Sequence, residues 1–261
     1  MTNLETPSND FEVSVLIPAK NEAENIPSLV TEIHQSLHLY VTFEVVLVND
    51  GSTDETARVF TETCESLNVP AQLISTEHSV GQSTALYIAG HNARAKWLVT
   101  IDGDGQNDPA DIPNMVSEAN SLQGSTDFCI AGYRHKRKDT SWKRFQSRIA
   151  NRVRNWFLND GVPDTGCGLK LIPKSTWVKL PYFNHMHRYL PALIKRIGGD
   201  IRVVPVAHRD RTAGVSKYTA WNRVWVGIVD MFAVKWLIAR TKHPVIKQHT
   251  HINAEQKNNA A

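Results

Sequence analysis

Two aspartates separated by a single glycine, Asp102-Gly103-Asp104, form the segment of this 261-residue chain best suited to chemistry. Both carboxylates can face one cavity only if the loop turns tightly, and adjacent carboxylates repel unless protons or a cation compensate them. Such oxygen ligands suit Mg²⁺ or Mn²⁺, with diphosphate oxygens completing the coordination. A solvated Asp-Gly turn is the competing interpretation, because this spacing on its own is a weak signal.

The position of the acidic segment strengthens the metal interpretation. It directly follows residues 97–101, a short apolar run typical of a buried strand. Residues 13–17 and 43–48 are similar runs, and each also ends at a polar loop, at residues 19–22 and 49–51. We therefore expect three polar loops to follow three buried strands.

Segments with helical periodicity separate these strands, at residues 22–37, 81–95 and 108–122, and weaker strands are expected at 71–75 and 127–131. Apolar strands alternating with helices predict an α/β fold, a mostly parallel sheet covered by helices on both faces. Ligands bind beyond the carboxyl ends of such strands, so the three polar loops should converge on one rim.

The pattern changes after Arg134. A basic amphipathic helix is expected at residues 141–158, a strand at 169–172, a helix at 184–197, a strand at 201–206 and a last hydrophobic helix at 221–239. The expected organisation is a flexible N-terminus (1–10), a catalytic domain (11–217), an amphipathic, membrane-interfacial helix (218–240) and a disordered tail (241–261).

Composition and charge exclude some classes of function. A net charge of +3 is too small to indicate nucleic-acid binding, and the basic residues lie beside an acidic rim. Three scattered cysteines give neither a disulfide framework nor a metal-type spacing, and Cys167 is expected to be a small buried thiol. The N-terminus has no secretory pattern, and no run of about 18 apolar residues predicts a membrane span. We expect the chemistry to take place in the cytosol.

Two further aspartates lie near the predicted rim. Asp50 ends the second strand, where a carboxylate can accept hydrogen bonds from a base or ribose, and ligand contact is favoured for it. Asp54 follows a Gly-Ser-Thr turn, and capping of the next helix is sufficient to explain it.

Several segments in one order carry a specific resemblance. Residues 15–22, 44–54 and 102–106 resemble the family 2 glycosyltransferases, which have the GT-A fold. Residues 164–170, 187–190 and 211–218 are similar to the dolichyl- and polyprenyl-phosphate sugar transferases, the dolichyl-phosphate mannose synthases in particular. The matching segments run from about residue 13 to residue 237.

The resemblance implies roles for matching residues. The nucleoside would contact Pro18, Ala19, Glu22 and Asp50. The metal ligands would be Asp102, Asp104 and Gln106, and Gly103 would also lie against the donor. The donor diphosphate would be gripped by Arg211, Ser216 and Lys217. The acceptor phosphate would be bound by Arg134, Arg144, Ser147 and Arg188. Catalysis would involve Asp104, Arg211, Lys217 and Asp164.

Elementary chemistry agrees with this assignment. The leaving diphosphate gains negative charge as the sugar bond breaks, so a metal ion and basic side chains stabilise the transition state. A sugar hydroxyl acceptor would need a general base, for which Asp164 is the obvious candidate. A phosphate acceptor is already anionic and can attack unaided, which predicts direct displacement with inversion.

The resemblance thus implies transfer of a sugar, mannose from GDP-mannose as first expectation, to a polyprenyl or dolichyl phosphate. The alternative is transfer to a hydroxyl acceptor in cell-envelope glycan or lipid glycosylation. A non-catalytic nucleotide-sugar binding protein is a different class, and the intact pair Asp102 and Asp104, together with Arg211 and Lys217, argues against it. The tryptophans of residues 221–239 favour a membrane interface over a core helix. We therefore expect a peripheral protein on the cytoplasmic face of the inner membrane.

Overall fold

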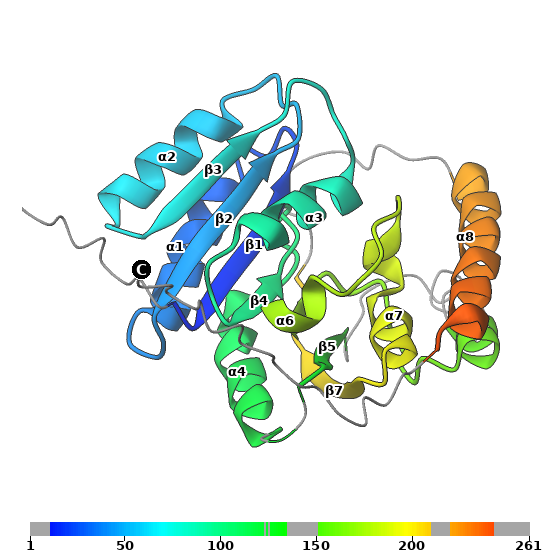
Figure 1. The fold of residues 1–261 in the computed structure, drawn as a ribbon. Coiled ribbons are helices and arrows are strands. Elements are labelled where there is room, and N and C mark those ends of the chain that lie inside the picture. The colour runs from blue at the N-terminus through cyan, green and yellow to red at the C-terminus, as the bar shows by residue number, and fades with distance from the viewer. Residues whose placement is uncertain (1–10, 123, 125, 135–150, 210–219, 243–261) are drawn as a thin grey trace, which may run out of the picture.

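A single seven-stranded sheet organises the chain. The computed structural model describes residues 11–122, 124, 126–134, 151–209 and 220–242 (Figure 1). The strands are β1 (Val13–Ala19), β2 (Phe43–Asn49), β3 (Ala71–Ser75), β4 (Trp97–Thr100), β5 (Phe128–Arg134), β6 (Lys170–Pro173) and β7 (Asp200–Val206). Their order is β3-β2-β1-β4-β6-β5-β7, and β6 alone runs antiparallel to its neighbours β4 and β5. The prediction of a mostly parallel sheet is confirmed.

Helices cover both faces of this sheet (Figure 1). They are α1 (Ile26–Leu37), α2 (Thr56–Ser66), α3 (Gln82–Asn92), α4 (Ile112–Ser121), α6 (Lys174–Trp177), α7 (Leu190–Arg196) and α8 (Ala220–Arg240), with 3₁₀ turns η1 (Pro109–Asp111) and η2 (Met186–Arg188). A further helical stretch covers residues 151–158.

The alternation of side chains along β1 divides the core into two layers. Val15 and Ile17 pack in one cluster with residues of α1, α2 and α4, whereas Leu16 packs in the other with residues of α3 and α7. Successive side chains of a strand point to opposite faces, so a strand with no polar face must be covered on both sides. Each fully buried residue of this size contributes about 1.5–3 kcal/mol to the free energy of unfolding.

The prediction of one continuous helix over residues 184–197 is wrong. The chain forms η2 and then α7, with His185 in the left-handed region (φ +68°) before the 3₁₀ turn. Pro191 stands in the first turn of α7, where its missing N–H costs nothing, and this explains why that helix begins at Leu190. The break places His187 and Arg188 on a short turn rather than on a long helix.

Helix α8 packs through one face against the rest of the described chain. Val234 is fully buried, His185 Nδ1 lies 3.0 Å from Asp230 Oδ2, and the hydroxyl of Tyr189 donates to the carbonyl of Gly227. Phe232 meets Phe157 of the 151–158 stretch edge to face, and the two helices lie side by side at the right of Figure 1. Across the described ranges, no helix combines the length and apolar character that crossing a membrane requires.

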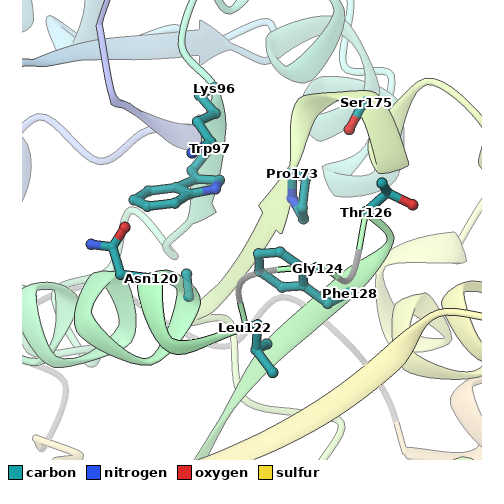
Figure 2. A pocket seen from close by; sticks show the side chains of 10 residues that line it. Lys96, Trp97, Asn120, Leu122, Gly124, Thr126, Phe128, Pro173 and Ser175 are labelled. Carbon is teal, nitrogen blue, oxygen red and sulfur yellow. The ribbon is translucent and has the colours of Figure 1, made fainter.

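A cavity of about 420 Å³, whose lining residues Figure 2 shows, lies at the start of β4, whereas the acidic loop follows the end of that strand. Trp97, which begins β4, and Pro173, which ends β6, are paired in register and line it together with Phe128. None of the predicted site residues in the described part of the chain lines this cavity. It is therefore separate from the candidate site.

Candidate active site

The acidic loop extends from the end of β4 and packs against the first polar loop. A Cβ added to Gly103 would lie 3.2 Å from the carbonyl oxygen of Pro18 and 3.6 Å from both Ala19 Cβ and Glu22 Cγ. The Asn107 side chain accepts from the backbone N–H of Asp102, which closes the turn. The convergence of these two loops on one rim is confirmed for the described residues.

Two groups hold the carboxylate of Asp102. Gln82 Nε2, at the start of α3, donates to Asp102 Oδ1 over 2.8 Å. On the other side the backbone of Gly168 lies so close that an added Cβ would overlap the carboxylate. The hydroxyl of Thr100 donates to the carbonyl of Gly168 (2.6 Å), so this wall is anchored to β4. The carboxylate therefore has little freedom to rotate.

The Asp102 carboxyl ionises less readily than an ordinary carboxyl. Burial raises the pKa of Asp102 to about 6, and the neighbouring charge of Asp104 adds to the rise. Lys170, Arg134 and the hydrogen bond from Gln82 lower it, but they do not compensate fully. Two neighbouring carboxylates attract a cation, and their oxygens fit the preferences of Mg²⁺ or Mn²⁺.

Protein carboxylates alone do not complete a metal site. Within the described residues, no three His, Cys, Asp or Glu side chains gather closely enough to hold an ion. Gln106 donates its backbone N–H to Asp104 Oδ1 (3.2 Å). Gln106 therefore belongs to the same turn as Asp104. Further oxygens from a ligand would be needed beside Asp102 and Asp104.

The backbone carbonyl of Gln106 also connects the acidic loop to the segment after β7. It accepts from the N–H of Arg209, and Asn107 forms a bridge with His208. The chain then continues toward residues 210–219, so the predicted diphosphate loop follows directly from a segment bonded to the acidic loop. Arg211, Ser216 and Lys217 themselves lie outside the described residues.

The carboxylate of Asp50 accepts hydrogen bonds from within the protein. It accepts from the backbone N–H groups of Val80 and Gly81 and from the hydroxyl of Ser79. Gly51, at φ +61°, lies so close to this turn that a Cβ would come within 2.7 Å of Ser79 N. Asp50 thus locates the turn that begins α3, and its contact with a nucleoside remains a prediction.

The first and second polar loops are joined to each other. Asn21, in the left-handed region at φ +54°, accepts from the N–H of Thr53, and Glu22 N donates to Thr56 Oγ1. Glu22 Oε2 also accepts from the Asn25 side chain.

Asp54 accepts from the N–H groups of Ala23 and Thr56, which confirms its structural role at the start of α2.

Arg134 and Asp164 form a doubly hydrogen-bonded ion pair. Arg134 Nε and Nη2 lie 2.6 and 2.8 Å from the two carboxylate oxygens, and both side chains are largely buried. Arg154 likewise pairs with Asp160 and donates to Thr165 Oγ1, so two arginines fix the loop of residues 160–168. This pairing gives Asp164 an ordering role, and the partner that the structure shows for it is Arg134.

Of the other residues predicted to bind the acceptor phosphate, the structure describes only Arg188. Arg188 lies on η2 and is half-buried, whereas Arg144 and Ser147 lie outside the described residues. Cys167 is buried and free, as expected. The phosphate-binding assignments stay predictions.

Four residues of the site have no role assigned from the sequence: Gln82, Ser83, Lys170 and His187, of which the last two lie in segments that carry the resemblance. Lys170, a buried residue on β6, donates to the carbonyls of Thr165 and Cys167 behind the acidic loop. Ser83 and His187 share a hydrogen bond of 2.6 Å beside Gln82. Loss of water around His187 lowers its pKa to about 3, so the ring is neutral at ordinary pH. A polar residue at a helix start carries no signal that could have singled out Gln82.

Residues 14–176 match the sequence model described as Glycosyl transferase family 2. A dodecaprenyl-phosphate galacturonate synthase of Rhizobium johnstonii is 30% identical over 242 residues, covering 91% of this chain and 70% of that protein. An undecaprenyl-phosphate 4-deoxy-4-formamido-L-arabinose transferase of Pseudomonas aeruginosa is 30% identical over 209 residues, covering 80% of this chain and 60% of the relative. The chain therefore spans less than two thirds of the length of the second relative.

Solved structures share the fold at lower identity. The mannosyltransferase PcManGT from Pyrobaculum calidifontis, in complex with GDP-Man and Mn²⁺, gives a TM-score of 0.66 at 19% identity, covering 91% of this chain and 67% of that one. Glucosyl-3-phosphoglycerate synthase from Mycobacterium tuberculosis, in complex with Mn²⁺, UDP-glucose and glycerol 3-phosphate, gives 0.62 at 17% identity, covering 90% and 82%. At such identities the likeness concerns the fold alone.

Proposed function

Because this chain belongs to glycosyl transferase family 2 and has the GT-A fold, we propose that it transfers a sugar from a nucleotide-sugar to the phosphate of a polyprenyl phosphate. The observation that carries the proposal is the paired Asp102 and Asp104 on the rim where the polar loops meet. Burial and the neighbouring charge of Asp104 raise the pKa of Asp102, and a divalent cation would offset the charges of both carboxylates and of a diphosphate. The names of two relatives, both transferring sugars to prenyl phosphates, support the acceptor class.

The cation would be Mg²⁺ or Mn²⁺, held by Asp102, Asp104 and Gln106 together with oxygens of the donor diphosphate. When bound, it would neutralise charge that develops on the leaving group. The described donor atoms are oxygens, which fits either ion. Arg211, Ser216 and Lys217 would add basic and hydroxyl groups on the same diphosphate, and Pro18, Ala19, Glu22 and Asp50 would face the nucleoside.

The reaction proposed is a single displacement. A phosphate oxygen of the acceptor attacks the anomeric carbon as the bond from that carbon to the diphosphate breaks, and the bonding pair leaves with the nucleoside diphosphate. The configuration at the anomeric carbon is inverted. Arg134, Arg144, Ser147 and Arg188 would bind the acceptor phosphate.

The state of Asp164 favours a phosphate acceptor over a hydroxyl acceptor. A hydroxyl would need a general base within hydrogen-bond reach. Both oxygens of Asp164 accept from Arg134, which stabilises the ionised carboxylate and leaves it a poor proton acceptor. An acceptor that arrives already ionised needs no such base.

The donor sugar is a separate question. The two relatives carry galacturonate and 4-deoxy-4-formamido-L-arabinose in their names, so they lend no support to mannose in particular. Mannose from GDP-mannose therefore stays a prediction of the sequence resemblance. The shape of the loops around the donor decides between these sugars.

A lipid acceptor calls for access to a membrane surface, and we propose peripheral attachment on the cytoplasmic side. Val229, Phe232 and Trp236 of α8 are more than half exposed, and so is Trp156 of the neighbouring stretch. Lys235 lies over the ring of Phe157 and Arg240 over that of Trp236, which brings cations to the edges of this apolar surface. Aromatic rings flanked by cations suit an interface with anionic headgroups.

The proposal is tested with the purified chain, Mn²⁺ or Mg²⁺, a short-chain polyprenyl phosphate and a panel of nucleotide-sugars. We expect one donor to give a glycolipid of the corresponding mass, and the matching free polyprenol to give none. Product from the free polyprenol instead would establish the hydroxyl acceptor. Absence of product with every donor, together with absence of nucleotide binding, would overturn the proposed function.

Asp104→Ala should lower the rate by about 100-fold or more, since one fixed electrostatic partner of a developing charge is typically worth 10²–10³ in rate. The rate is measured with the donor found active above. Asp108→Ala, four residues further along at the start of η1, is the control, because Asp108 caps that turn. An Asp104→Ala rate equal to that of the control would refute the metal assignment.

A further inference from the structure

Gln82 is the described side chain that bridges α3 to the acidic loop. Its amide donates to Asp102 Oδ1 over 2.8 Å, while the Gly168 backbone bounds the carboxylate on the other side. A carboxylate bounded in this way keeps one plane, and the orientation of the remaining lone pairs is fixed with it. Gln82 thus controls the direction in which Asp102 presents its oxygens.

The position of Gln82 is itself fixed from both sides along the chain. Before it, Gly81 (φ +87°) donates its N–H to Asp50, which ties the turn to the end of β2. After it, Ser83 is buried and hydrogen-bonded to the ring of His187. Because His187 is neutral, this bond does not change over the ordinary range of pH. The helix start cannot slide without breaking one of these attachments.

We propose that Gln82 is a positioning residue that sets the Asp102 carboxylate for the divalent cation and the donor diphosphate. The inference rests on the proposed function, since it needs a cation at Asp102 and Asp104. Groups that orient a metal ligand typically change metal affinity by about 10–100-fold when they are removed. Loss of the Gln82 amide should therefore act on the binding of the cation more than on the reaction once the cation is bound.

Gln82→Met removes the amide and keeps the length and much of the volume of the side chain. Gln72→Met is the matched control, because Gln72 Nε2 also donates to a carboxylate, that of Glu44, over 3.0 Å. Glu44 belongs to a separate cluster with Ser14 and Arg94. Both variants lose one amide–carboxylate bond, but only one of those bonds is in the site.

Binding of Mn²⁺ is measured directly by electron paramagnetic resonance, in the presence of UDP, GDP, CDP, ADP or dTDP in parallel. We expect Gln82→Met to weaken Mn²⁺ binding by about 10-fold or more and Gln72→Met to leave it within about twofold of the wild type. In the transfer assay, the half-saturating Mn²⁺ concentration should rise for Gln82→Met while kcat at saturating Mn²⁺ falls much less. Unfolding temperatures confirm that both variants are folded.

The outcomes separate the inference from the proposed function. If the wild type binds Mn²⁺ with a nucleotide and Gln82→Met binds it equally well, the positioning role is overturned and the proposed function stands. A fall in kcat with unchanged Mn²⁺ affinity also overturns the positioning role. If the wild type binds Mn²⁺ with none of the five nucleotides, the proposed function fails and the inference fails with it.

Discussion

Gly168 shows how closely the site is built around one carboxylate. Its φ does not lie in the left-handed region, whereas an added Cβ would overlap Asp102, so space requires a glycine there. The same backbone holds Thr100 through its carbonyl and therefore cannot retreat without loosening β4. Any side chain at this position must displace Asp102 instead.

Gly168→Ala should lower kcat/KM by about 100-fold, because a displacement of about 1 Å at a catalytic group can cost that much. The measurement is steady-state kinetics with the donor identified above. Gly227→Ala, where an added Cβ meets nothing within 4 Å, is the control and should leave the rate unchanged. Equal rates for the two variants would show that the carboxylate has room to move.

The raised pKa of Asp102 has a stability consequence with a defined sign. A carboxyl that ionises at about 6 in the folded chain, against an ordinary 3.8, opposes folding once it is ionised. Its destabilising effect is absent below about pH 4, grows between pH 4 and 6, and is complete above. The rise of the Asp102 pKa from 3.8 to about 6 limits this loss of folding free energy to about 3 kcal/mol.

Asp102→Asn should therefore raise the unfolding temperature of the metal-free protein at pH 7.5, and the gain should shrink as the pH falls from 6 toward 4. The same variant should lose activity, since the neutral amide is a weaker ligand. Thermal unfolding with EDTA across this pH range makes the measurement. A gain that stays constant with pH would assign the effect to packing rather than to charge.

At the scale of elements, the turn before α3 joins the second strand to the acidic loop. Asp50 holds three groups of this turn, and Gly51 leaves the space for it. The second polar loop therefore acts on the site through the position of α3, whatever it contacts in a bound nucleotide. Asp50 therefore has a structural function in positioning α3 that is separate from any contact with a ligand.

Asp50→Ala should lower the free energy of unfolding by about 1–3 kcal/mol, because it leaves backbone donors without their acceptor. Asp54→Ala is the control, since Asp54 also accepts from two backbone N–H groups but at an exposed helix start, where the loss should be about 1 kcal/mol. Chemical denaturation gives both values. An Asp50→Ala variant of wild-type stability that no longer binds nucleotide would make ligand contact its main role.

The sequence predicted the elements that follow strong local rules. The buried strands β1, β2 and β4 and the polar loops after them come directly from apolar runs and their ends. The predicted continuous helix at residues 184–197 missed the break between η2 and α7, although Pro191 is a residue that favours the first turn of a helix. The antiparallel direction of β6 could not be predicted, because the four residues Lys170–Pro173 carry no signal of strand direction. Nor could the pairing of Arg134 with Asp164 be found, since 30 residues separate them.

At the scale of the whole molecule, the site draws on both halves of the chain, whereas the exposed apolar surface of α8 and residues 151–158 lies in the second half. The first half supplies β1 to β4, the acidic loop and α3, and the second half supplies β6, β7, α7, α8 and the stretch at residues 151–158 (Figure 1). Both halves pack in the same hydrophobic cluster, which contains Leu16 of β1 and Val234 of α8. A membrane surface bound by α8 would therefore lie at a fixed distance from the acidic loop.

Replacing Phe232 and Trp236 together with Asp should weaken binding to vesicles containing anionic lipid by about tenfold or more, because burial of one such side chain contributes about 1.5–3 kcal/mol. Co-sedimentation at low and high salt makes the measurement. Leu39→Asp is the control, since Leu39 is 87% exposed on a different part of the molecule, just after α1. Unchanged binding by the double variant would remove α8 from the proposed interface.

The two faces of α8 also govern how the protein can be shortened. A chain cut before Ala220 would lose the exposed aromatics, but it would also uncover the cluster around Val234 and deprive Tyr189 of the carbonyl of Gly227. His185 would lose its carboxylate partner two positions from His187. Truncation for solubility would therefore damage the scaffold of the site, and substitutions on the outer face are the way to separate lipid affinity from folding.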